Sequence, residues 1–267
     1  MNFYKYEGTG NDFILFDDRN AEFPSGNFAL IKKLCDRRFG IGADGLMLLQ
    51  KSVKADFYMK YYNSDGNESS MCGNGGRCIA AFASNLKIAG YSSIFEAIDG
   101  LHETNITNSG NTFIVQLKMQ DVKQIEKRDD QTFVLNTGSP HFVRFLNEKI
   151  STVKIVEEAK KIRYNTEFSK AGININFINS LNQNTIHIRT YERGVEDETL
   201  SCGTGVTAAA LCTAIKNDLP SGLNTINVKT EGGELNVRFD YDKSTNSFSD
   251  IWLIGPATFV FAGTIAI

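Results

Sequence analysis

Hydrophobic and polar residues alternate over short stretches along much of the chain, a pattern typical of half-buried β-strands. Six stretches are also rich in β-branched and aromatic residues, and most are bounded by Gly, Asn or Asp. These predicted strands are Phe13–Phe16, Phe57–Asn63, Phe113–Lys118, Thr185–Tyr191, Ile226–Lys229 and Glu234–Phe239. We therefore expect a protein built mainly of short strands, with a few helices between them.

Four segments carry apolar residues at helical spacing instead. Asn27–Arg38 and Val156–Arg163 each have one apolar face, which predicts amphipathic helices. Two more helices are predicted to begin near Gly75 and Gly205, each after a glycine-rich turn, and both are apolar nearly all round. A helix without a polar face is typically buried. The charged segment Asp121–Gln131 shows no periodicity and is therefore interpreted as a linker.

The turns before the two buried helices belong to an internal repeat. The pattern Glu-[Ser/Thr]-x-x-Cys-Gly-x-Gly occurs at residues 68–75 and again at residues 198–205, an offset of 130 residues (198 − 68). Upstream, Thr9-Gly10 is echoed by Thr137-Gly138. Echoes at nearly one offset indicate a duplicated lobe. The sequence thus predicts an α+β fold of two pseudo-symmetric lobes, each a mixed, mostly antiparallel sheet around a central helix.

Composition narrows the classes of protein that fit this plan. The chain has 267 residues, 42% of them hydrophobic, which is enough to bury a sizeable core. Its 28 Lys and Arg against 31 Asp and Glu give a formal net charge of −3. The basic surplus of a nucleic-acid-binding protein is therefore absent, and we expect a small molecule as partner and no nucleic acid.

Three observations predict a cytoplasmic protein. No apolar run approaches the ~20 residues that cross a bilayer, so no membrane contact is expected. The first residues show no basic segment followed by an apolar one, so no signal peptide is predicted. Five cysteines, an odd number, fit free thiols in a reducing compartment better than a disulfide framework.

The two Cys-Gly-x-Gly turns are the candidate reactive centres. A cysteine at a helix N-terminus lies among unpaired backbone N–H groups and the positive end of the helix dipole, which favours its thiolate. The glycines after Cys72 and Cys202 let several N–H groups converge into a cradle suited to a carboxylate. Two such thiols facing each other across a cleft between the lobes have the geometry for inverting a carbon centre.

The cysteines admit other interpretations. A free cysteine is more often a small buried hydrophobe than a catalyst, and we expect that role for Cys35, Cys78 and Cys212 on apolar helix faces. A zinc site does not fit, because Cys72 and Cys78 lack the usual spacing and the chain has only three His, so no metal is expected. A redox-active pair of Cys72 and Cys202 stays open.

Residues Gly40–Gly45 match the Gly-x-Gly-x-x-Gly pattern of dinucleotide-binding turns. In those turns a strand precedes the glycines and a helix follows them. Here a predicted helix precedes the glycines, and the apolar run Leu46–Leu49 follows them. We therefore interpret the segment as a helix-to-strand loop and expect no nucleotide to bind there.

Taken together, the motifs resemble one family, the diaminopimelate epimerases. The resemblance spans nearly the whole chain, in order, through residues 8–13 (Gly-Thr-Gly-Asn-Asp-Phe), 63–66 (Asn-Ser-Asp-Gly), 71–78 (Met-Cys-Gly-Asn-Gly-Gly-Arg-Cys), 138–141 (Gly-Ser-Pro-His), 191–194 (Tyr-Glu-Arg-Gly) and 201–205 (Ser-Cys-Gly-Thr-Gly). It implies a cofactor-independent isomerase that converts LL-2,6-diaminopimelate to meso-diaminopimelate. That reaction lies on the bacterial route to lysine and peptidoglycan.

The resemblance also implies that the last strand returns to the first lobe and that the active site lies in the cleft between the lobes. Residues 1–118 and 256–267 are then expected to form the N-terminal lobe, which carries Cys72. Residues 119–255 would form the C-terminal lobe, which carries Cys202. A homodimer is expected on the resemblance alone.

The resemblance further assigns roles at the matching positions. Cys72 and Cys202 would be the two acid–base thiols, and His141 would orient or tune a thiol. Glu192, also expected among the catalytic residues, suits an ammonium group, and Arg193 can clamp a carboxylate through two hydrogen bonds. The residues expected to contact the substrate are Asn11, Asn63, Gly73, Asn74, Asn174, Glu192, Arg193, Gly203 and Thr204. Without the resemblance, Glu192 and Arg193 would be interpreted as an exposed surface pair.

Two positions depart from the family pattern. Many members carry Asn where this chain has Ser139, and some carry Gln where it has Gly45. Both positions are therefore left out of the expected site. Neither departure touches the thiols or the pair formed by Glu192 and Arg193.

Three rival functions remain open. A proline racemase or hydroxyproline epimerase of the same fold also uses paired thiols, but typically has His where this chain has Asn74. A thiol redox sensor would form a reversible disulfide between Cys72 and Cys202 and show no turnover. A plain binding module for an amino acid would tolerate replacement of both cysteines. The related isomerases of the phenazine pathway lack both catalytic cysteines and fit less well.

Overall fold

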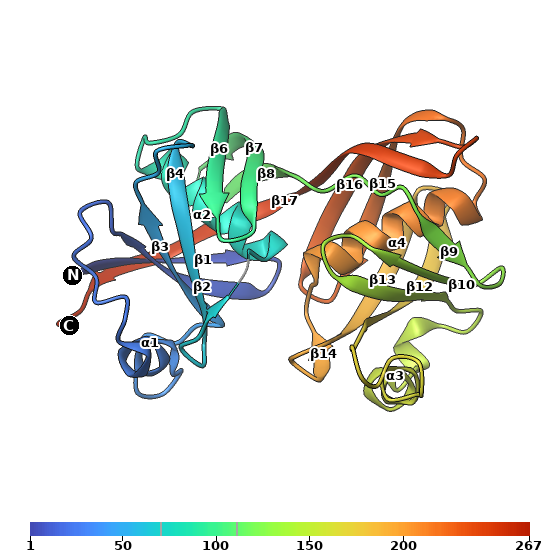
Figure 1. Cartoon of the computed structure of the whole chain (residues 1–267), viewed down its shortest axis with the longest axis horizontal. Coiled ribbons are helices and arrows are strands. Elements are labelled where there is room, and N and C mark those ends of the chain that lie inside the picture. Colours follow the sequence, from blue (N-terminus) through green and yellow to red (C-terminus); the bar gives the residue numbers. More distant parts are fainter. Residues whose placement is uncertain (70, 111) are drawn as a thin grey trace. The chain divides into compact units, whose positions relative to one another are not determined.

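Short strands joined by tight turns make up most of the structure, a computed structural model that describes residues 1–69, 71–110 and 112–267. The strands and α-helices divide between two compact units (Figure 1). Unit 1 comprises Met1–Leu117 and Gly255–Ile267, and unit 2 comprises Lys118–Ile254. Ser70, in the first copy of the repeat, lies outside the described residues.

The strands of unit 1 form a closed ring. They are β1 (Asn2–Gly8), β2 (Asn11–Asp17), β3 (Gly45–Gln50), β4 (Phe57–Asn63), β6 (Ser92–Ala97), β7 (Gly100–Ser109), β8 (Thr112–Lys118) and the end of β17 (Ser247–Thr264). Each strand pairs with the next in this order, and β17 pairs in turn with β1. The pairs β2–β3 and β4–β6 are parallel and the others antiparallel. The sheet is therefore mixed and mostly antiparallel.

Unit 2 repeats this arrangement. Its strands are β9 (Ile125–Lys127), β10 (Thr132–Asn136), β11 (Pro140–Phe145), β12 (Asn174–Asn182), β13 (Thr185–Glu192), β15 (Gly222–Thr230), β16 (Gly233–Asp242) and the first part of β17. They pair in this order, with β11–β12 and β13–β15 parallel. Two short strands, β5 (Glu68–Ser69) and β14 (Asp197–Thr199), form equivalent hairpins with β4 and β13.

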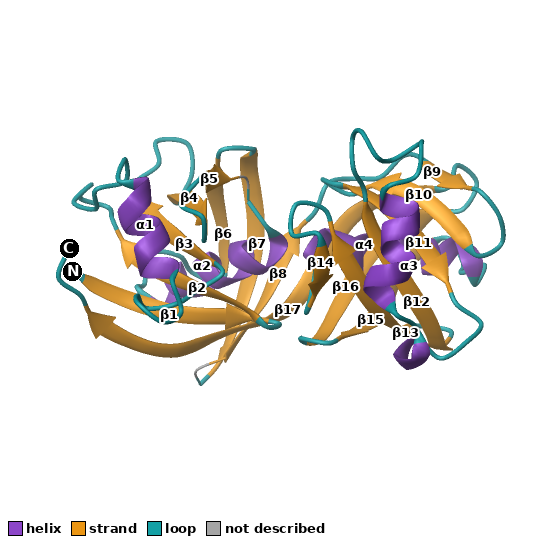
Figure 2. Cartoon of the chain, turned by 90° about the horizontal axis from the view of Figure 1, so that it is seen from below, coloured by secondary structure: helices purple, strands orange, loops and turns teal. Residues whose placement is uncertain are grey.

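One helix lies inside each ring: α2 (Gly73–Asn85) in unit 1 and α4 (Gly203–Lys216) in unit 2 (Figures 1 and 2). Both are buried nearly all round because their small residues let the strands approach from every side. In α2, Phe82 is completely buried against the rings of Tyr4 and Tyr6. Burying such a side chain stabilises the fold by about 2 kcal/mol.

The other two predicted helices cover the outside of the rings (Figure 2). Helix α1 (Phe28–Cys35) is capped by Asn27, whose Oδ1 accepts a hydrogen bond from the Leu30 N–H at 3.1 Å. Helix α3 (Ile155–Arg163) buries only one face, and its charged face is solvated. A turn of 3₁₀ helix, Ile150–Thr152, precedes α3. None of the helices in the described ranges is long and apolar enough to cross a membrane.

The predicted α+β fold with two pseudo-symmetric lobes is thus confirmed, since each ring encloses a helix that begins at one copy of the repeat. The upstream echo also corresponds in space. Thr9 Oγ1 lies 3.4 Å from Asn74 Oδ1 in unit 1, and Thr137 Oγ1 donates to the Thr204 carbonyl at 2.8 Å in unit 2. Both contacts join the Thr-Gly turn to the first turn of the central helix.

The prediction of a linker at Asp121–Gln131 is wrong. Val122 is buried and pairs with Phe248, and β9 within the segment pairs with β10. Most side chains of the segment reach solvent, and its paired stretches are too short to show periodicity. The chain crosses between units elsewhere, at Leu117–Lys118 and Ile254–Gly255.

The glycine-rich segment Gly40–Gly45 joins α1 to β3, which confirms that it is a helix-to-strand loop. Gly42 has a positive φ of 84°, a conformation that side chains rarely adopt. Its carbonyl oxygen accepts a hydrogen bond from the Lys5 ammonium. The loop therefore serves to bring a backbone acceptor to a buried cation of β1.

Candidate active site

Cys72 is the N-cap residue of α2. Its backbone is extended (φ −107°, ψ 148°), and its Sγ accepts a hydrogen bond from the Gly75 N–H at 3.2 Å. The side chain is partly exposed, whereas Gly73 and Asn74 are buried in the first helical turn. The sulfur therefore lies at the positive end of the helix dipole, which favours a thiolate.

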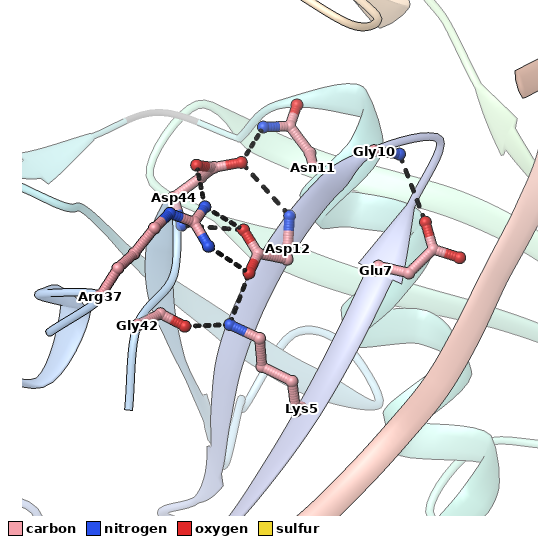
Figure 3. Close-up of polar contacts among 8 residues, drawn as sticks. All are labelled: Lys5, Glu7, Gly10, Asn11, Asp12, Arg37, Gly42 and Asp44. Atoms are coloured by element: carbon pink, nitrogen blue, oxygen red, sulfur yellow. Dashed lines mark hydrogen bonds and ion pairs between the residues drawn. The ribbon is translucent and has the colours of Figure 1, made fainter. Parts of the chain in front are cut away.

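Asn74 and Asn11 contact each other directly beside this turn. Asn74 Nδ2 donates to Asn11 Oδ1 at 2.7 Å, and Asn11 Nδ2 donates to Asp44 Oδ2 at 2.7 Å (Figure 3). Asn11 is thus held at both ends of its amide, which fixes which end is donor and which is acceptor. The structure brings these two predicted site residues together in unit 1.

Asp44 is held in turn by a cluster of charges at the start of β2 (Figure 3). Arg37 bridges Asp44 and Asp12, with Nη2–Oδ1 distances of 2.7 and 2.6 Å. Lys5, only 6% exposed, contacts Asp12 at 2.7 Å. Burial alone would raise the pKa of Asp12, but hydrogen bonds and charge from Arg37 and Lys5 lower it to about 2. Asp12 is therefore a permanent anion that anchors both cations.

Asn63 ends β4 with an exposed side chain, opposite Gly45 on β3. The next residue, Ser64, donates its N–H to the Asp44 carbonyl at 3.1 Å, so this strand end lies beside the residue that holds Asn11.

The structure also explains why position 45 is a glycine. A Cβ there would lie 2.5 Å from Tyr61 Cε2 and 2.7 Å from the Tyr62 carbonyl oxygen. The Tyr61 ring occupies the space that a glutamine would need.

Cys202 is the N-cap residue of α4 and is 8% exposed. Its Sγ lies 3.5 Å from Thr204 Oγ1. The following Gly203 and the buried Gly205 complete the turn. A Cβ on Gly205 would come within 2.5 Å of Asn176 Oδ1, so a glycine is needed for this close approach of the helix to β12.

His141 lies behind Thr204 and is completely buried. Its Nε2 is 2.9 Å from Thr204 Oγ1, and its Nδ1 is 3.1 Å from Asn176 Nδ2. Asn176 accepts from Thr190 with Oδ1 and donates to the Phe142 carbonyl with Nδ2, which fixes its orientation. Nδ1 of His141 is therefore the acceptor, and the network assigns the ring proton to Nε2.

The imidazole of His141 is neutral at physiological pH. Burial, assisted by the positive charge of Arg193, lowers its pKa to about 3. With Nε2–H donating to Thr204 Oγ1, the hydroxyl proton of Thr204 is left to donate to Cys202 Sγ. A donor to sulfur stabilises the thiolate, so His141 acts on Cys202 through Thr204.

Asn174 connects the turn before β11 with the end of β13 in unit 2. Its Nδ2 donates to Ser139 Oγ at 2.9 Å and to the Pro140 carbonyl at 3.2 Å. Its Oδ1 accepts from the Arg193 backbone N–H at 2.8 Å. Ser139, which departs from the family pattern, thus supports Asn174 with its hydroxyl. The Arg193 side chain is exposed and donates to the Ala171 carbonyl at 3.2 Å.

Glu192, at the end of β13, is partly buried and accepts from Thr199 Oγ1 at 3.1 Å. Burial raises its pKa, an effect that the hydrogen bond from Thr199 partly offsets. Among the described residues it forms no ion pair with Arg193, so the interpretation of the two as a surface pair is wrong. A partly desolvated carboxylate of this kind gains most from an ammonium partner.

Each unit thus gathers its own set of predicted residues. Unit 1 brings together Cys72, Gly73, Asn74 and Asn11, with Asn63 at a neighbouring strand end. Unit 2 brings together Cys202, Gly203, Thr204 and His141, and separately Asn174, Glu192 and Arg193 around the end of β13. Within the part of the chain that is described, no cluster of His, Cys, Asp and Glu is suited to a metal ion.

Sequence analysis missed the residues that hold these side chains. Asn176 could have been found, because it lies two positions after Asn174 on one strand and so faces the same side. Asp44 precedes Gly45 in the glycine-rich loop, which offered no sign of a contact with Asn11. Arg77 stood inside the quoted motif, where nothing indicated that its side chain is completely buried.

The model of the family described as diaminopimelate epimerase matches residues 3–125 and 133–260. The chain belongs to the diaminopimelate epimerase family. The predictions of this family and of an isomerase are therefore confirmed.

Relatives named diaminopimelate epimerase match the chain over almost its full length. The protein of Flavobacterium psychrophilum is 51% identical over 265 residues, which are 99% of this chain and 100% of the relative. The protein of Chlorobaculum tepidum is 38% identical, covering 97% of this chain and 99% of the relative. The matches leave no large part of either relative without a counterpart here.

Solved structures with the same fold are distant in sequence. A phenazine biosynthesis protein of the PhzF family from Bacillus anthracis has a TM-score of 0.73 at 15% identity, covering 100% of this chain and 99% of that one. A probable proline racemase from Agrobacterium radiobacter has a TM-score of 0.68 at 13% identity, covering 100% and 93%. These likenesses show the shared fold and leave the substrate to be argued from the site.

Proposed function

We propose that this diaminopimelate epimerase family member converts LL-2,6-diaminopimelate to meso-diaminopimelate, with Cys72 and Cys202 as the acid–base pair. The observation that carries the proposal is the repeated geometry of the two thiols. Each cysteine is the N-cap of a helix enclosed by a ring of strands, and each is followed by glycines in the first turn. The names of relatives matched over their full length support the substrate.

In the proposed mechanism one thiolate removes the proton from the α-carbon and becomes a thiol. The other thiol gives its proton to the opposite face of that carbon and becomes a thiolate. One C–H bond breaks and one forms, so the protein holds the same number of protons before and after. Reversal exchanges the two roles, and no cofactor takes part. The mechanism requires both sulfurs to reach one carbon in the substrate complex.

The negative charge that builds on the substrate needs donors that are already in place. We assign this role to the backbone N–H groups of Gly73, Asn74, Gly203 and Thr204, at the positive ends of α2 and α4. They would bind the carboxylate on the reacting carbon and stabilise the charge in the transition state. Because these groups are fixed by the helices, little reorganisation is needed when the charge forms.

The second amino-acid head of diaminopimelate needs its own contacts. Asn11, Asn63, Asn174, Glu192 and Arg193 are proposed to bind the ammonium and carboxylate groups. The exposed guanidinium of Arg193 and the partly desolvated carboxylate of Glu192 have the complementary charges. His141 is proposed as a positioning residue that acts on Cys202 through Thr204.

A proline racemase shares the fold and is the nearest rival. Proline has one carboxylate and one amine, so it would leave Glu192 and Arg193 without a purpose. Asn74, moreover, is hydrogen-bonded to Asn11 and Arg77, and this arrangement suits an amide at position 74. The redox-pair interpretation needs a disulfide between Cys72 and Cys202, and none joins them in the part of the chain that the structure describes.

The proposal extends to where the protein acts. The five cysteines, all among the described residues, form no disulfide, which fits a reducing compartment, and we propose that the protein acts in the cytoplasm. We also propose a homodimer, on the family resemblance. Light scattering at several concentrations measures the assembly directly.

The first test follows the substrate proton. The reduced protein is incubated with LL-diaminopimelate in deuterated water without added cofactor, and the α-proton is followed by NMR. We expect the α-proton signal to fall while the meso isomer appears. The variants Cys72→Ala and Cys202→Ala are expected to lose both changes. Cys212→Ala, a buried cysteine on α4, is the matched control and should retain turnover.

Three other results would each favour one of the rival functions. Exchange of proline with no change in LL-diaminopimelate would keep the thiol mechanism and reject the substrate. No exchange of either, together with a disulfide between Cys72 and Cys202 that forms and breaks reversibly, would favour the redox sensor. Unchanged binding by both cysteine variants, without turnover in the parent protein, would favour a binding module.

A further inference from the structure

Arg77 is a buried cation with only neutral partners. Its side chain is 0% exposed inside the ring of unit 1. The guanidinium donates to the carbonyls of Gly73 (3.2 Å) and Pro256 (3.3 Å), to Thr9 Oγ1 (3.0 Å) and to Asn74 Oδ1 (3.1 Å). Among the described residues no carboxylate forms an ion pair with it. Its hydrogen bonds are satisfied, but its charge is not compensated.

Such a charge is unfavourable for the fold itself. Removing a guanidinium from water costs several kcal/mol unless an anion compensates it. Burial accordingly lowers the pKa of Arg77. The location adds to the cost, since Arg77 lies in the second turn of α2, close to the N-terminus, where the helix dipole is already positive. A stable fold gains nothing from a cation here, so the arrangement points to an anion that forms during function.

The second copy of the repeat shows what the fold needs at this position. At the same offset of 130 residues, Arg77 corresponds to Thr207 and Gly73 to Gly203. Thr207 Oγ1 donates to the Gly203 carbonyl at 3.0 Å, as Arg77 Nη1 does to that of Gly73. A neutral hydroxyl thus satisfies the equivalent carbonyl in unit 2. The positive charge is an addition made only beside Cys72.

We propose that Arg77 is a positioning residue whose buried charge holds Cys72 as the thiolate in the unliganded protein. Cys202, which lies beside the neutral hydroxyl of Thr204, then starts as the thiol, and Thr204 stabilises its thiolate only after it has given up its proton. The two thiols are equivalent by the repeat but carry different charges at rest. This inference rests on the proposed function, since it concerns the acid–base role of Cys72.

Other titratable groups also face this turn. They come from α2, β1, β2, the turn between β6 and β7, and β7 itself, and are Cys78, Glu7, Asp12, Asp99 and His102. Burial raises the pKa of Cys78, so it is uncharged. Asp12 is neutralised by its two cations, and Asp99 accepts from the Met71 N–H and contacts His102 at 3.3 Å.

The carboxylates Glu7 and Asp99 oppose a thiolate at Cys72, but they are partly solvated. Water screens their charge, whereas the guanidinium of Arg77 acts from the dry interior of the ring. In unit 2 the positive charge of Arg193 acts on His141 from an exposed position just after β13, and the adjacent Glu192 carries the opposite charge. The balance of charge therefore favours the thiolate of Cys72.

The test measures how readily Cys72 reacts at each pH. Cys202→Ala uncouples the pair, and iodoacetamide alkylation of Cys72 is followed by peptide mass spectrometry as pH rises. In the Arg77→Gln variant we expect the pH midpoint of the alkylation rate to rise by at least about one unit. At a pH below the midpoints of both proteins, Cys72 of the variant should therefore be alkylated about tenfold more slowly than Cys72 of the protein with Arg77. Arg77→Lys, which keeps the charge, should stay near the parent profile.

The matched control is Thr207→Val, which removes the equivalent hydrogen bond without a change in charge. It should leave the Cys72 profile in place. Circular dichroism and the melting temperature verify that each variant is folded. A Cys72 midpoint unchanged in folded Arg77→Gln would overturn the proposal. An equal shift in Arg77→Lys would do the same, because the effect would then come from packing.

A second measurement covers the case in which Arg77→Gln does not fold. The Cys72 midpoint in Cys202→Ala is compared with the Cys202 midpoint in Cys72→Ala, both with Arg77 intact. We expect the Cys72 midpoint to be lower, and an equal or higher value would reject the proposal. Because alkylation needs no turnover, these results are independent of whether LL-diaminopimelate is the substrate.

Discussion

His141 is enclosed on all sides in unit 2 and exchanges hydrogen bonds with Asn176 and Thr204. Its pKa is lowered to about 3, mainly by burial, from an ordinary value near 6.5. The folded protein therefore keeps a neutral imidazole over a pH range in which the unfolded chain binds a proton. A residue placed to orient Thr204 thus also makes the fold sensitive to acid.

The sign of this effect follows from linkage. Between about pH 6.5 and pH 3 the unfolded state holds one more proton at His141, so the folding equilibrium constant falls by up to about tenfold per pH unit. We expect the urea midpoint to fall less steeply with decreasing pH in His141→Gln than in the parent protein. His187→Gln, which removes a partly exposed histidine of β13, is the control and should keep a slope closer to that of the parent. Equal slopes in all three proteins would contradict the assignment.

At the level of the elements, β3 and β4 depend on the absence of a side chain at Gly45. A Cβ there meets the Tyr61 ring at 2.5 Å and the Tyr62 carbonyl at 2.7 Å. We expect Gly45→Ala to lower the free energy of unfolding by about 2 kcal/mol through overpacking. In a Tyr61→Ala background the same change should cost about 1 kcal/mol less. Urea unfolding measures both.

Gly90→Ala serves as the control for this pair, since a Cβ on Gly90 meets nothing within 4 Å. It should change the urea midpoint little. Strictly additive costs of Gly45→Ala and Tyr61→Ala would show that the ring is not what excludes a side chain at position 45. In that case the backbone contact with Tyr62 alone would explain the glycine.

Local pattern predicted the four α-helices and six of the strands, and it missed others, among them β12 and β17. The four α-helices were found because their apolar residues recur at helical spacing. Strand β12 was missed because its buried Asn174 and Asn176 interrupt the apolar run, although Asn176 faces the first turn of α4. Strand β17 contains Gly255 and Pro256, which resemble a break in the sequence. Buried polar residues of the candidate site interrupt the apolar pattern, and the strand that contains them is then not predicted.

The repeat predicted more of the candidate site than any single element did. It marked Cys72 and Cys202 because a motif that recurs at one offset identifies the same structural position twice. It could not predict the supporting contacts, since Asp44 with Asn11 and Asn176 with His141 join residues far apart in the chain. Such partners have no local signal, because side chains that meet only in the folded state leave no periodicity.

At the scale of the whole molecule, the last strand, β17, contributes to the sheets of both units. The first part of β17 belongs to unit 2, and its end pairs with β8 and β1 to close the ring of unit 1. We expect deletion of residues 255–267 to open that ring and to remove the Pro256 carbonyl from Arg77. Hydrogen exchange should then become fast in β1, β8 and α2, while unit 2 stays protected.

Deletion of Ala266 and Ile267 alone, which lie beyond β17, is the control and should leave exchange unchanged. Full protection of α2 in the longer deletion would mean that seven strands of unit 1 enclose the helix without the eighth. Loss of protection in both units would mean that they unfold as one.

The closing strand also sets the order in which the protein is completed during synthesis. Unit 2 contains nothing after Ile254, so its ring is complete once that residue has left the ribosome. Phe3 in β1, by contrast, cannot pair until Gly263, its partner near the other end of the chain, has been synthesised. Until then β1 and β8 are unpaired edges, which attract other strands. Most of unit 1 is synthesised before unit 2, but unit 1 is completed after it. The free edge of β1 is therefore exposed on the nascent chain during most of translation, and that of β8 during the later part.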